Sequence, residues 1–380
     1  MARRPPEPTP VEIYARGFAE EPGYLDFPRL APVGEHALAE SRAMHDVLAK
    51  ARFGVLSPLA EQDARARAAL STLLRVRDEQ IVLQPSTSQA LLHVMFGLTG
   101  TVAASPGEFP AVGYAIARAA ESLGVLSAHD LVPDHDRVTP GVLREQLTDQ
   151  VSAIVVSLVD YRTGHLVDLE GIRQVIGDRM LIVDAVQGAG VVDAPWELCD
   201  VIVGGGQKWL RAGPGTGYLV VSDRAREQLT PVWSGWNAHE SGEVEHEVLP
   251  PRADAGAFRT GLGDPFAEAR LAGAVEAILA AGVPAIHAAV LERTARVIAL
   301  ADEVGLEVVS PREDAERAGI VSIAPHPEQL SSLAAALHNH GVSATVRGGR
   351  LRLGAHVSTS DETFEQLHSA FAEWAIAARG

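Results

Sequence analysis

The stretch that most constrains the fold runs from Met180 to Ser222. It contains three short apolar runs, which end at Asp184, Val203 and Val221, and glycine-containing turns lie between them. Apolar runs of this length, rich in Val and Ile and bounded by Gly or Pro, are typical of short buried strands. The sequence therefore predicts that one carboxylate, Asp184, and one amine, Lys208, lie at the ends of buried strands.

Strands and helices alternate over residues 80–222. Further predicted strands cover residues 80–83, 101–104, 125–128 and 152–159, and a helical pattern follows each of them. This alternation indicates βαβ crossovers and a mainly parallel sheet that is covered by helices on both faces. Ligand sites of such sheets lie at the carboxyl ends of the strands. The residues expected at that edge are Ser86, Phe109, Tyr161, Asp184 and Lys208.

The segments on either side have a different pattern. Residues 1–33 are rich in proline and predict an extended arm, and helical patterns follow at 35–51 and 59–74. Beyond residue 222, helices are expected at 265–280, 284–304 and 328–339, with strands at 306–309, 320–323, 343–346 and 350–353. A chain of 380 residues is long for one domain. We therefore expect an N-terminal arm and helix (1–50), a large domain (51–255) and a small C-terminal α+β domain (256–380).

The composition narrows the classes of partner and compartment. The formal net charge of −17 at pH 7 argues against nucleic acid and anionic membranes as partners. No apolar run reaches the roughly 18 residues that span a bilayer, and no secretory signal follows Arg3 and Arg4, so a cytoplasmic protein is expected. Cys199 is the one cysteine, which excludes an internal disulfide and a cysteine metal cluster, and no metal is expected.

Lys208 differs from nearly all other basic residues of the chain. Lys50 and Lys208 are the only lysines. The other residues among the 32 lysines and arginines of the chain are all arginines. A guanidinium stays protonated and cannot form an imine, whereas an amine that is desolvated in a pocket can. Lys208, which follows the glycines 204–206, is therefore a candidate for covalent chemistry, with an ordinary loop lysine as the alternative.

The same glycines allow a nucleotide-binding interpretation. A glycine run after a strand is similar to the dinucleotide fingerprint, and Asp223 lies near the position of its ribose-binding acid. The third glycine of that fingerprint, however, would fall on Trp209, whose bulk blocks close packing of helix on strand. Trp209 also stands where a P-loop has the Ser or Thr that binds magnesium. Both nucleotide-binding interpretations are therefore disfavoured.

Several motifs together resemble a known family. The runs Asp184-Ala-Val-Gln187, Gln207-Lys208-Trp209 and Gly213-Pro-Gly-Thr-Gly217 are similar to the cofactor-binding core of pyridoxal-phosphate enzymes of fold type I. The resemblance is specifically to the class V aminotransferase family, which includes kynureninases, cysteine desulfurases, isopenicillin-epimerase-like proteins and carbon–sulfur lyases. It implies a three-layer α/β fold with a mainly parallel central sheet, pyridoxal 5'-phosphate as the cofactor, and a homodimer with shared active sites.

The resemblance implies which residues between Met180 and Ser222 bind the cofactor. Lys208 would condense with its aldehyde and act as the catalytic base. Asp184 would keep its pyridine nitrogen protonated, because a carboxylate in contact raises the proton affinity of that nitrogen. Gln187 would donate to its phenolic oxygen, and Val186 would pack against its ring.

Further cofactor contacts are implied outside that stretch. Ser86, Thr87 and Ser88 open a predicted helix, whose free N–H groups attract a phosphate. An ordinary N-cap is the alternative there, and the resemblance favours the phosphate. Phe109, in the run Glu-Phe-Pro, would stack on the pyridine face. Trp236, in a loop similar to the Gly-Trp-x-x-His of kynureninases, would also contact the cofactor.

The resemblance also implies how an amino-acid substrate is bound. Arg352 matches the C-terminal arginine that binds the substrate carboxylate in kynureninases, and a guanidinium can bind a carboxylate through two hydrogen bonds. Arg347 and Arg350 are nearby alternatives. Tyr161 and Arg162 lie in a run similar to the Asn-Tyr-Arg-Thr-Gly of kynureninases and would face the substrate. Arg162 can equally brace its own loop.

The sequence leaves several reactions open. We expect an aminotransferase that acts on a small-molecule amino acid. The alternatives are a lyase of the kynureninase or carbon–sulfur type, an epimerase, and a non-catalytic binding protein. Cys199 lies beside a predicted strand and not in a mobile C-terminal loop, so persulfide chemistry is not expected. Leu262 replaces a family threonine that reaches the phosphate of the neighbouring subunit, and Thr260 can compensate.

Overall fold

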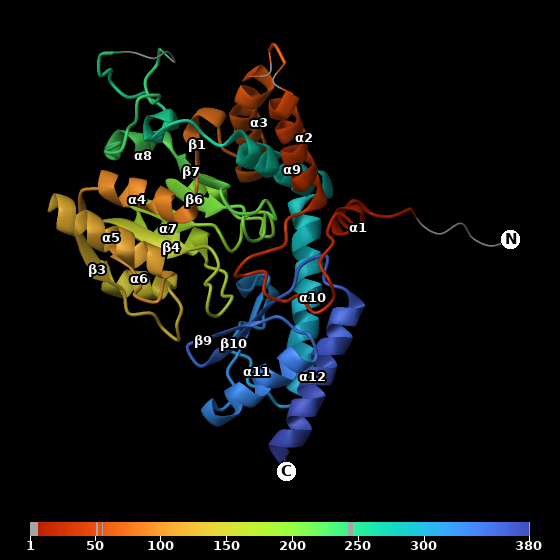
Figure 1. Ribbon diagram of the computed structural model, residues 1–380. Helices are drawn as coiled ribbons and strands as arrows, with labels where there is room; N and C mark the ends of the chain where they lie inside the picture. The colour runs from red at the N-terminus through yellow and green to blue at the C-terminus, as the bar shows by residue number, and fades with distance from the viewer. Residues whose placement is uncertain (1–6, 51, 55, 242–245, 380) are drawn as a thin grey trace.

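The computed structural model describes residues 7–50, 52–54, 56–241 and 246–379. In this part of the chain there is a seven-stranded sheet and a smaller three-stranded sheet near the C-terminus. Figure 1 shows the long helix α10 (Val283–Glu303) running from the layers around the large sheet to the smaller sheet. The predicted fold class, α/β with a mainly parallel central sheet and a smaller C-terminal α+β part, is confirmed.

All strands of the large sheet except β7 run in the same direction. The strands are β1 (Ile81–Gln84), β2 (Gly100–Ala104), β3 (Leu126–Asp130), β4 (Val151–Ser157), β5 (Met180–Asp184), β6 (Val201–Gly205) and β7 (Gly217–Val221). Their order is β1-β7-β6-β5-β4-β2-β3, and β7 is antiparallel to both neighbours. The connection between β6 and β7 is shorter than the dozen or so residues that a parallel crossover needs. The strands other than β7 therefore end at one common edge.

The two faces of the sheet pack into separate cores. In β5, Met180 and Ile182 belong to one core, and Leu181 and Val183 belong to the other, as the period of two in a strand requires. The first core contains α4 (Thr87–Gly97), α5 (Pro110–Leu123) and α8 (Asp223–Gln228). The second contains α3 (Leu56–Leu74), α6 (Pro140–Gln146), α7 (Leu169–Ile176) and α9 (Pro265–Ala281), and α2 (Glu35–Lys50) packs on α9.

The smaller sheet has a third core of its own. Its strands are β8 (Ile320–Ile323), β9 (Thr345–Arg347) and β10 (Arg350–Gly354), in the antiparallel order β8-β10-β9. The helices α10, α11 (Leu330–Asn339) and α12 (Asp361–Arg379) cover it. The N-terminal arm inserts Leu25 into this core. Short 3-10 helices occupy Asp78–Gln80, Trp196–Leu198, Ala255–Phe258, Asp314–Glu316 and Pro327–Gln329.

Two sequence-based expectations are wrong in detail. The arm of residues 1–33, of which 1–6 lie outside the described residues, contains α1 (Pro10–Ala15), because Thr9 and Glu12 form a capping box that starts a helix. The segment 306–309 is not a strand, and in the described chain it makes one isolated bridge between Val308 and Ile323. Two backbone hydrogen bonds flank this bridge, from Val309 to Ser322 and from Ala324 to Glu307, both 2.9 Å long.

The division of the chain into three parts stays a prediction. Its boundary at residue 51 lies outside the described residues. No single helix in the described ranges is long and apolar enough to cross a membrane, and α9 and α10 pass that test only as a pair bent by 84°.

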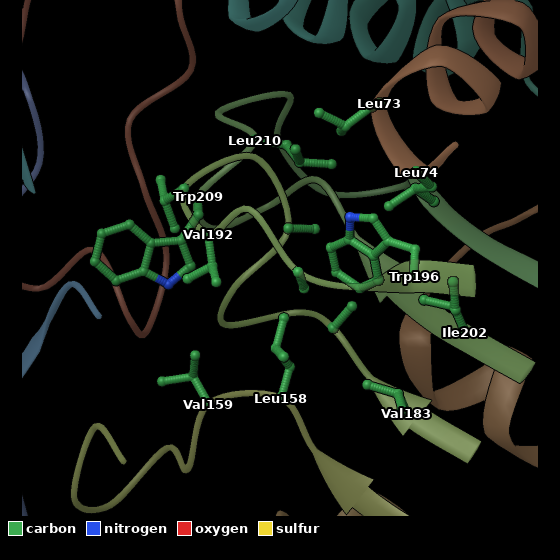
Figure 2. Packing of buried hydrophobic residues seen from close by; sticks show 14 of the residues in the cluster. Leu73, Leu74, Leu158, Val159, Val183, Val192, Trp196, Ile202, Trp209 and Leu210 are labelled. Carbon is green, nitrogen blue, oxygen red and sulfur yellow. The ribbon is translucent and has the colours of Figure 1, made fainter. Parts of the chain in front are cut away.

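The second core is built around two tryptophans. Trp196 and Trp209 are 2% and 1% exposed. Figure 2 shows Trp196 between Leu74 of α3 and Ile202 of β6. Trp196 thus fills the space between the sheet and the helix that covers it.

Replacing Trp196 with alanine is expected to destabilise the protein by about 3–5 kcal/mol, because a large buried ring is lost and a cavity remains. Urea denaturation followed by far-UV circular dichroism measures this loss. Ile376→Ala, at a side chain that is 76% exposed, is the control and should change stability by no more than about 0.5 kcal/mol. A loss below about 1 kcal/mol for Trp196→Ala would contradict the packing described here.

Candidate active site

Lys208 lies in a tight turn just after β6. The N–H of Arg211 donates to the carbonyl of Lys208 (3.0 Å), and the N–H of Ala212 donates to that of Gly206 (2.8 Å). The lysine is 8% exposed, and its Nζ lies 5.4 Å from the ring centroid of Phe109. Within the described part of the chain, no hydrogen bond or ion pair involves this amine. The site therefore holds a buried amine that is available for reaction.

Burial acts on the charges of Lys208 and Asp184 in opposite directions. Desolvation lowers the pKa of Lys208 from 10.5 to about 8, with Arg352 and Arg347 adding to the effect and Asp184 opposing it. Desolvation also raises the pKa of Asp184 above its usual value, while the N–H of Val186 and the charge of Lys208 oppose this rise. The two groups are close enough to influence each other, and the low pKa of the lysine makes its neutral form accessible near pH 8.

The end of β5 and the turn after it carry three of the predicted cofactor residues, Asp184, Val186 and Gln187. One oxygen of Asp184, which is 2% exposed, accepts from the N–H of Val186 at 3.0 Å. The amide of Gln187 donates to the carbonyl of Pro28 (3.0 Å) and accepts from the indole N–H of Trp209 (2.7 Å). One N–H of the Gln187 amide is left for another partner.

The N-terminus of α4 meets β7 at close range. Ser86 is its N-cap and accepts from the N–H of Gln89, while Thr87 is buried and its Oγ1 has no hydrogen-bond partner. Ser88 is exposed. A Cβ added to Gly217 would lie 2.7 Å from the backbone of Ser86, so only glycine permits this approach. The free N–H groups of the helix and an unpartnered hydroxyl together suit an anion.

An aromatic pair lies beside the lysine. Phe109 precedes α5, and its ring meets that of Tyr161 edge to face, with centroids 5.3 Å apart. Tyr161 follows β4, so these rings come from two different strand ends. The ring of Phe109 thus contacts both Tyr161 and the amine of Lys208.

Glu108, next to Phe109, is a residue that the sequence reasoning missed. Its carboxylate accepts from the N–H and the hydroxyl of Ser157. Burial raises the pKa of Glu108 to about 7, and the charges of Asp160 and Asp184 act in the same direction. The sequence signal for Glu108 was its position before Phe109 in the Glu-Phe-Pro run, and that signal does not show that Ser157 donates two hydrogen bonds to it.

The predicted substrate arginines differ in their pairing. Arg352 is 8% exposed, donates to the carbonyl of Tyr161 (2.8 Å), and keeps its Nε buried without a partner. Its nearest carboxylate among the described residues is Asp26, at 3.9 Å. Arg162, in contrast, pairs with Asp160 (3.1 Å) and Asp136 (3.3 Å). These pairs are those expected of the alternative in which Arg162 braces its loop.

Trp236 is not brought to Lys208 within this chain. It is 52% exposed and lines another pocket, together with Arg259 and Leu262. Leu262 is 81% exposed, and Thr260 is also exposed.

Comparison with known proteins identifies the family. The family described as Aminotransferase class-V matches residues 54–368. An uncharacterized aminotransferase of Bacillus subtilis (strain 168), YcbU, is 27% identical over 351 residues, which cover 88% of this chain and 90% of that protein. Kynureninase of Deinococcus radiodurans is 29% identical over 205 residues, 51% of this chain and 50% of that protein.

Solved structures show the same fold. The cystine C–S lyase C-DES, in complex with its reaction product cysteine persulfide, superposes with a TM-score of 0.83 at 18% identity, covering 93% of this chain and 97% of that one. In a second structure of C-DES, glycine is covalently linked to the pyridoxal-phosphate cofactor. Since the family match covers most of the sequence, this chain belongs to the class V aminotransferase family and is a pyridoxal-phosphate-dependent enzyme of fold type I.

Proposed function

We propose that the enzyme transfers the amino group of one α-amino acid to a 2-oxo acid, which gives the 2-oxo acid of the first and the amino acid of the second. The observation that carries this proposal is a buried, unpartnered amine, Lys208, beside the buried carboxylate of Asp184 at one edge of the sheet. Two comparisons support the proposal. The family match is one of them, and the other is a relative that is named as an aminotransferase and is matched over 90% of its length.

The residues at the site fit pyridoxal phosphate. The unpartnered Oγ1 of Thr87 and the N-terminus of α4 suit its phosphate. Asp184 suits its pyridine nitrogen, and the remaining N–H of Gln187 suits its phenolic oxygen. When bound, the cofactor supplies an electron sink for charge that develops at the substrate α-carbon. Phe109, Val186, Ser86 and Ser88 complete the proposed cofactor-binding set, and Trp236 stays a prediction.

Lys208 is proposed as the base that moves the α-proton. A general base works best when its pKa lies near the operating pH. Burial brings the pKa of this lysine to about 8, which suits that role. The ring of Phe109 lies beside Lys208, and the ring of Tyr161 packs against that of Phe109.

The α-carboxylate of the substrate is assigned to Arg352. Its Nε is buried and has no partner in the described chain, and a carboxylate would satisfy it. Tyr161 holds this guanidinium through its backbone carbonyl, so the arginine is oriented before the substrate arrives.

A lyase is the second candidate. The run from Asp160 to Gly164 is similar to that of kynureninases, and a curated kynureninase matches 51% of this chain. Both reactions need the same amine and the same removal of the α-proton, and they differ afterwards in the fate of the amino group and in whether a side-chain bond breaks.

We further propose a cytoplasmic homodimer. The exposed side chains of Trp236 and Leu262 lie together at one pocket, which is consistent with a surface that a second copy covers. The resemblance to fold type I enzymes supports a shared site there, with Thr260 in place of the family threonine. Sedimentation of the holoenzyme as a strict monomer with full activity would contradict this proposal.

Incubating the holoenzyme with a panel of amino acids tests the reaction. Transamination is expected to convert the cofactor to its pyridoxamine form and release a 2-oxo acid without ammonia, whereas a lyase releases ammonia or a cleaved side chain. Lys208→Ala should abolish both turnover and borohydride-trapped incorporation of the cofactor. Lys50→Ala, which removes the only other lysine, is the matched control and should leave both unchanged. No response to any amino acid by cofactor-loaded protein would favour the non-catalytic binding protein.

The covalent capture of pyridoxal phosphate by the apoprotein should accelerate as the pH rises through about 8. Burial favours the neutral amine and lowers the pKa of Lys208 from 10.5 to about 8, so the nucleophilic form appears at lower pH than for a free lysine. Borohydride trapping across a pH series in the Lys50→Ala background, where Lys208 is the one ε-amine, measures the midpoint. A rate that increases only near pH 10.5 would contradict the burial effect.

Gly217→Ala should weaken the binding of pyridoxal phosphate, because the added Cβ would lie 2.7 Å from the backbone of Ser86 and displace the N-terminus of α4. Titrating the apoprotein with the cofactor, followed by absorbance, measures the affinity. Gly113→Ala, where an added Cβ meets nothing within 4 Å, is the matched control and should bind the cofactor as the parent does. Equal affinities of the Gly217 variant and the parent would argue against a phosphate site at this turn.

A further inference from the structure

The pocket next to the aromatic pair carries an excess of positive charge. It has a volume of about 280 Å³, and four of its lining side chains are arginines: Arg162, Arg347, Arg350 and Arg352. The one carboxylate that lines it is Asp136. This concentration of cations occurs in a chain whose formal net charge is −17, so it is a local feature and not a consequence of composition.

Two of these arginines are neutralised by the protein itself. Arg350 pairs with Asp136 at 2.7 Å. Arg162 pairs with Asp136 and with Asp160. These two guanidinium groups are therefore paired with two carboxylates, and their charges are locally compensated.

Arg347 has no such partner among the described residues: no hydrogen bond or ion pair involves its guanidinium. Its Cζ lies 5.4 Å from the ring centroid of Tyr161 and 5.9 Å from that of Phe109. The Phe109 ring is in turn 5.4 Å from Nζ of Lys208. Arg347 is exposed and lies over the aromatic pair, and its hydrogen-bond donors have no protein partner among the described residues.

Cation–π attraction is the simplest explanation for the position of Arg347 over the two rings, since cations are attracted to aromatic faces. It leaves the exposed guanidinium of Arg347 open to a ligand, beside Arg352, whose one carboxylate neighbour among the described residues is Asp26 at 3.9 Å. An α-amino acid with a neutral side chain has one carboxylate, and Arg352 is assigned to it. An additional free guanidinium is satisfied by an additional anionic group on the substrate.

We propose that Arg347 binds a second carboxylate at the far end of the substrate side chain, so that the enzyme acts on dicarboxylic amino acids and their 2-oxo acids. This inference rests on the proposed function, because Arg352 must bind the α-carboxylate for Arg347 to be left for the distal one. The positive pocket also attracts dianionic substrates from solution. Aspartate and glutamate differ by one methylene group, so they place the distal carboxylate at two different distances from the α-carbon.

Kinetics of the holoenzyme with matched acid and amide substrates test the proposal. The parent enzyme should prefer glutamate or aspartate to glutamine or asparagine. Arg347→Gln should raise KM for the preferred acid by about tenfold to a hundredfold, the usual effect of losing a charged hydrogen-bond pair. KM for the corresponding amide should stay within about threefold, because the amide does not pair with the lost charge. Arg312→Gln, a surface arginine paired with Asp302, is the matched control and should change neither value.

A binding measurement separates this inference from the proposed reaction. Glutarate has two carboxylates and no amine, so it can be titrated into the holoenzyme by calorimetry without turnover. Arg347→Gln should weaken glutarate binding at least about tenfold and leave butyrate binding unchanged. If no amino acid is turned over but glutarate binding depends on Arg347, the proposed reaction fails and the dicarboxylate site stands. A preference of the parent for neutral amino acids, or an equal effect of Arg347→Gln on acid and amide, would overturn the dicarboxylate site.

Discussion

Lys208 and Asp184 are both withdrawn from water at the same edge of the sheet, and the rest of the site depends on this shared burial. Burial favours the neutral amine of Lys208 and opposes the ionised carboxylate of Asp184, so each group needs something that the protein alone does not provide. A bound cofactor with an aldehyde and a basic ring nitrogen satisfies both. The buried pair is therefore better understood as a prepared binding site than as an ion pair that stabilises the fold.

The surrounding structure keeps this pair in position through segments that are distant in sequence. The arm at Pro28 accepts a hydrogen bond from Gln187, and Trp209 donates to the same amide. Glu20 of the arm forms a buried ion pair with Arg211, three residues after Lys208. The turn that carries the lysine is thus fixed by the sheet on one side and by the N-terminal arm on the other.

Charge is distributed unevenly over the molecule. The chain as a whole is acidic, yet the pocket that adjoins the aromatic pair is lined by arginines and one carboxylate. Arg352 and Arg347 also lower the pKa of Lys208. The same two cations that are proposed to bind substrate carboxylates therefore help to keep the lysine neutral, and an anionic substrate would weaken that effect when it binds.

The sequence by itself determined the layered α/β architecture and the positions of Asp184 and Lys208 at strand ends, because hydrophobic periodicity is a local property of each element. It did not determine the direction of β7, the helix in the arm, or the hydrogen bonds from Ser157 to Glu108. Nor did it distinguish the paired Arg162 from Arg347, which it named only as an alternative to Arg352 and which has no ion pair among the described residues. Only the tertiary structure decided these, because pairing and desolvation depend on which distant segments come together and not on the residues beside them in the chain.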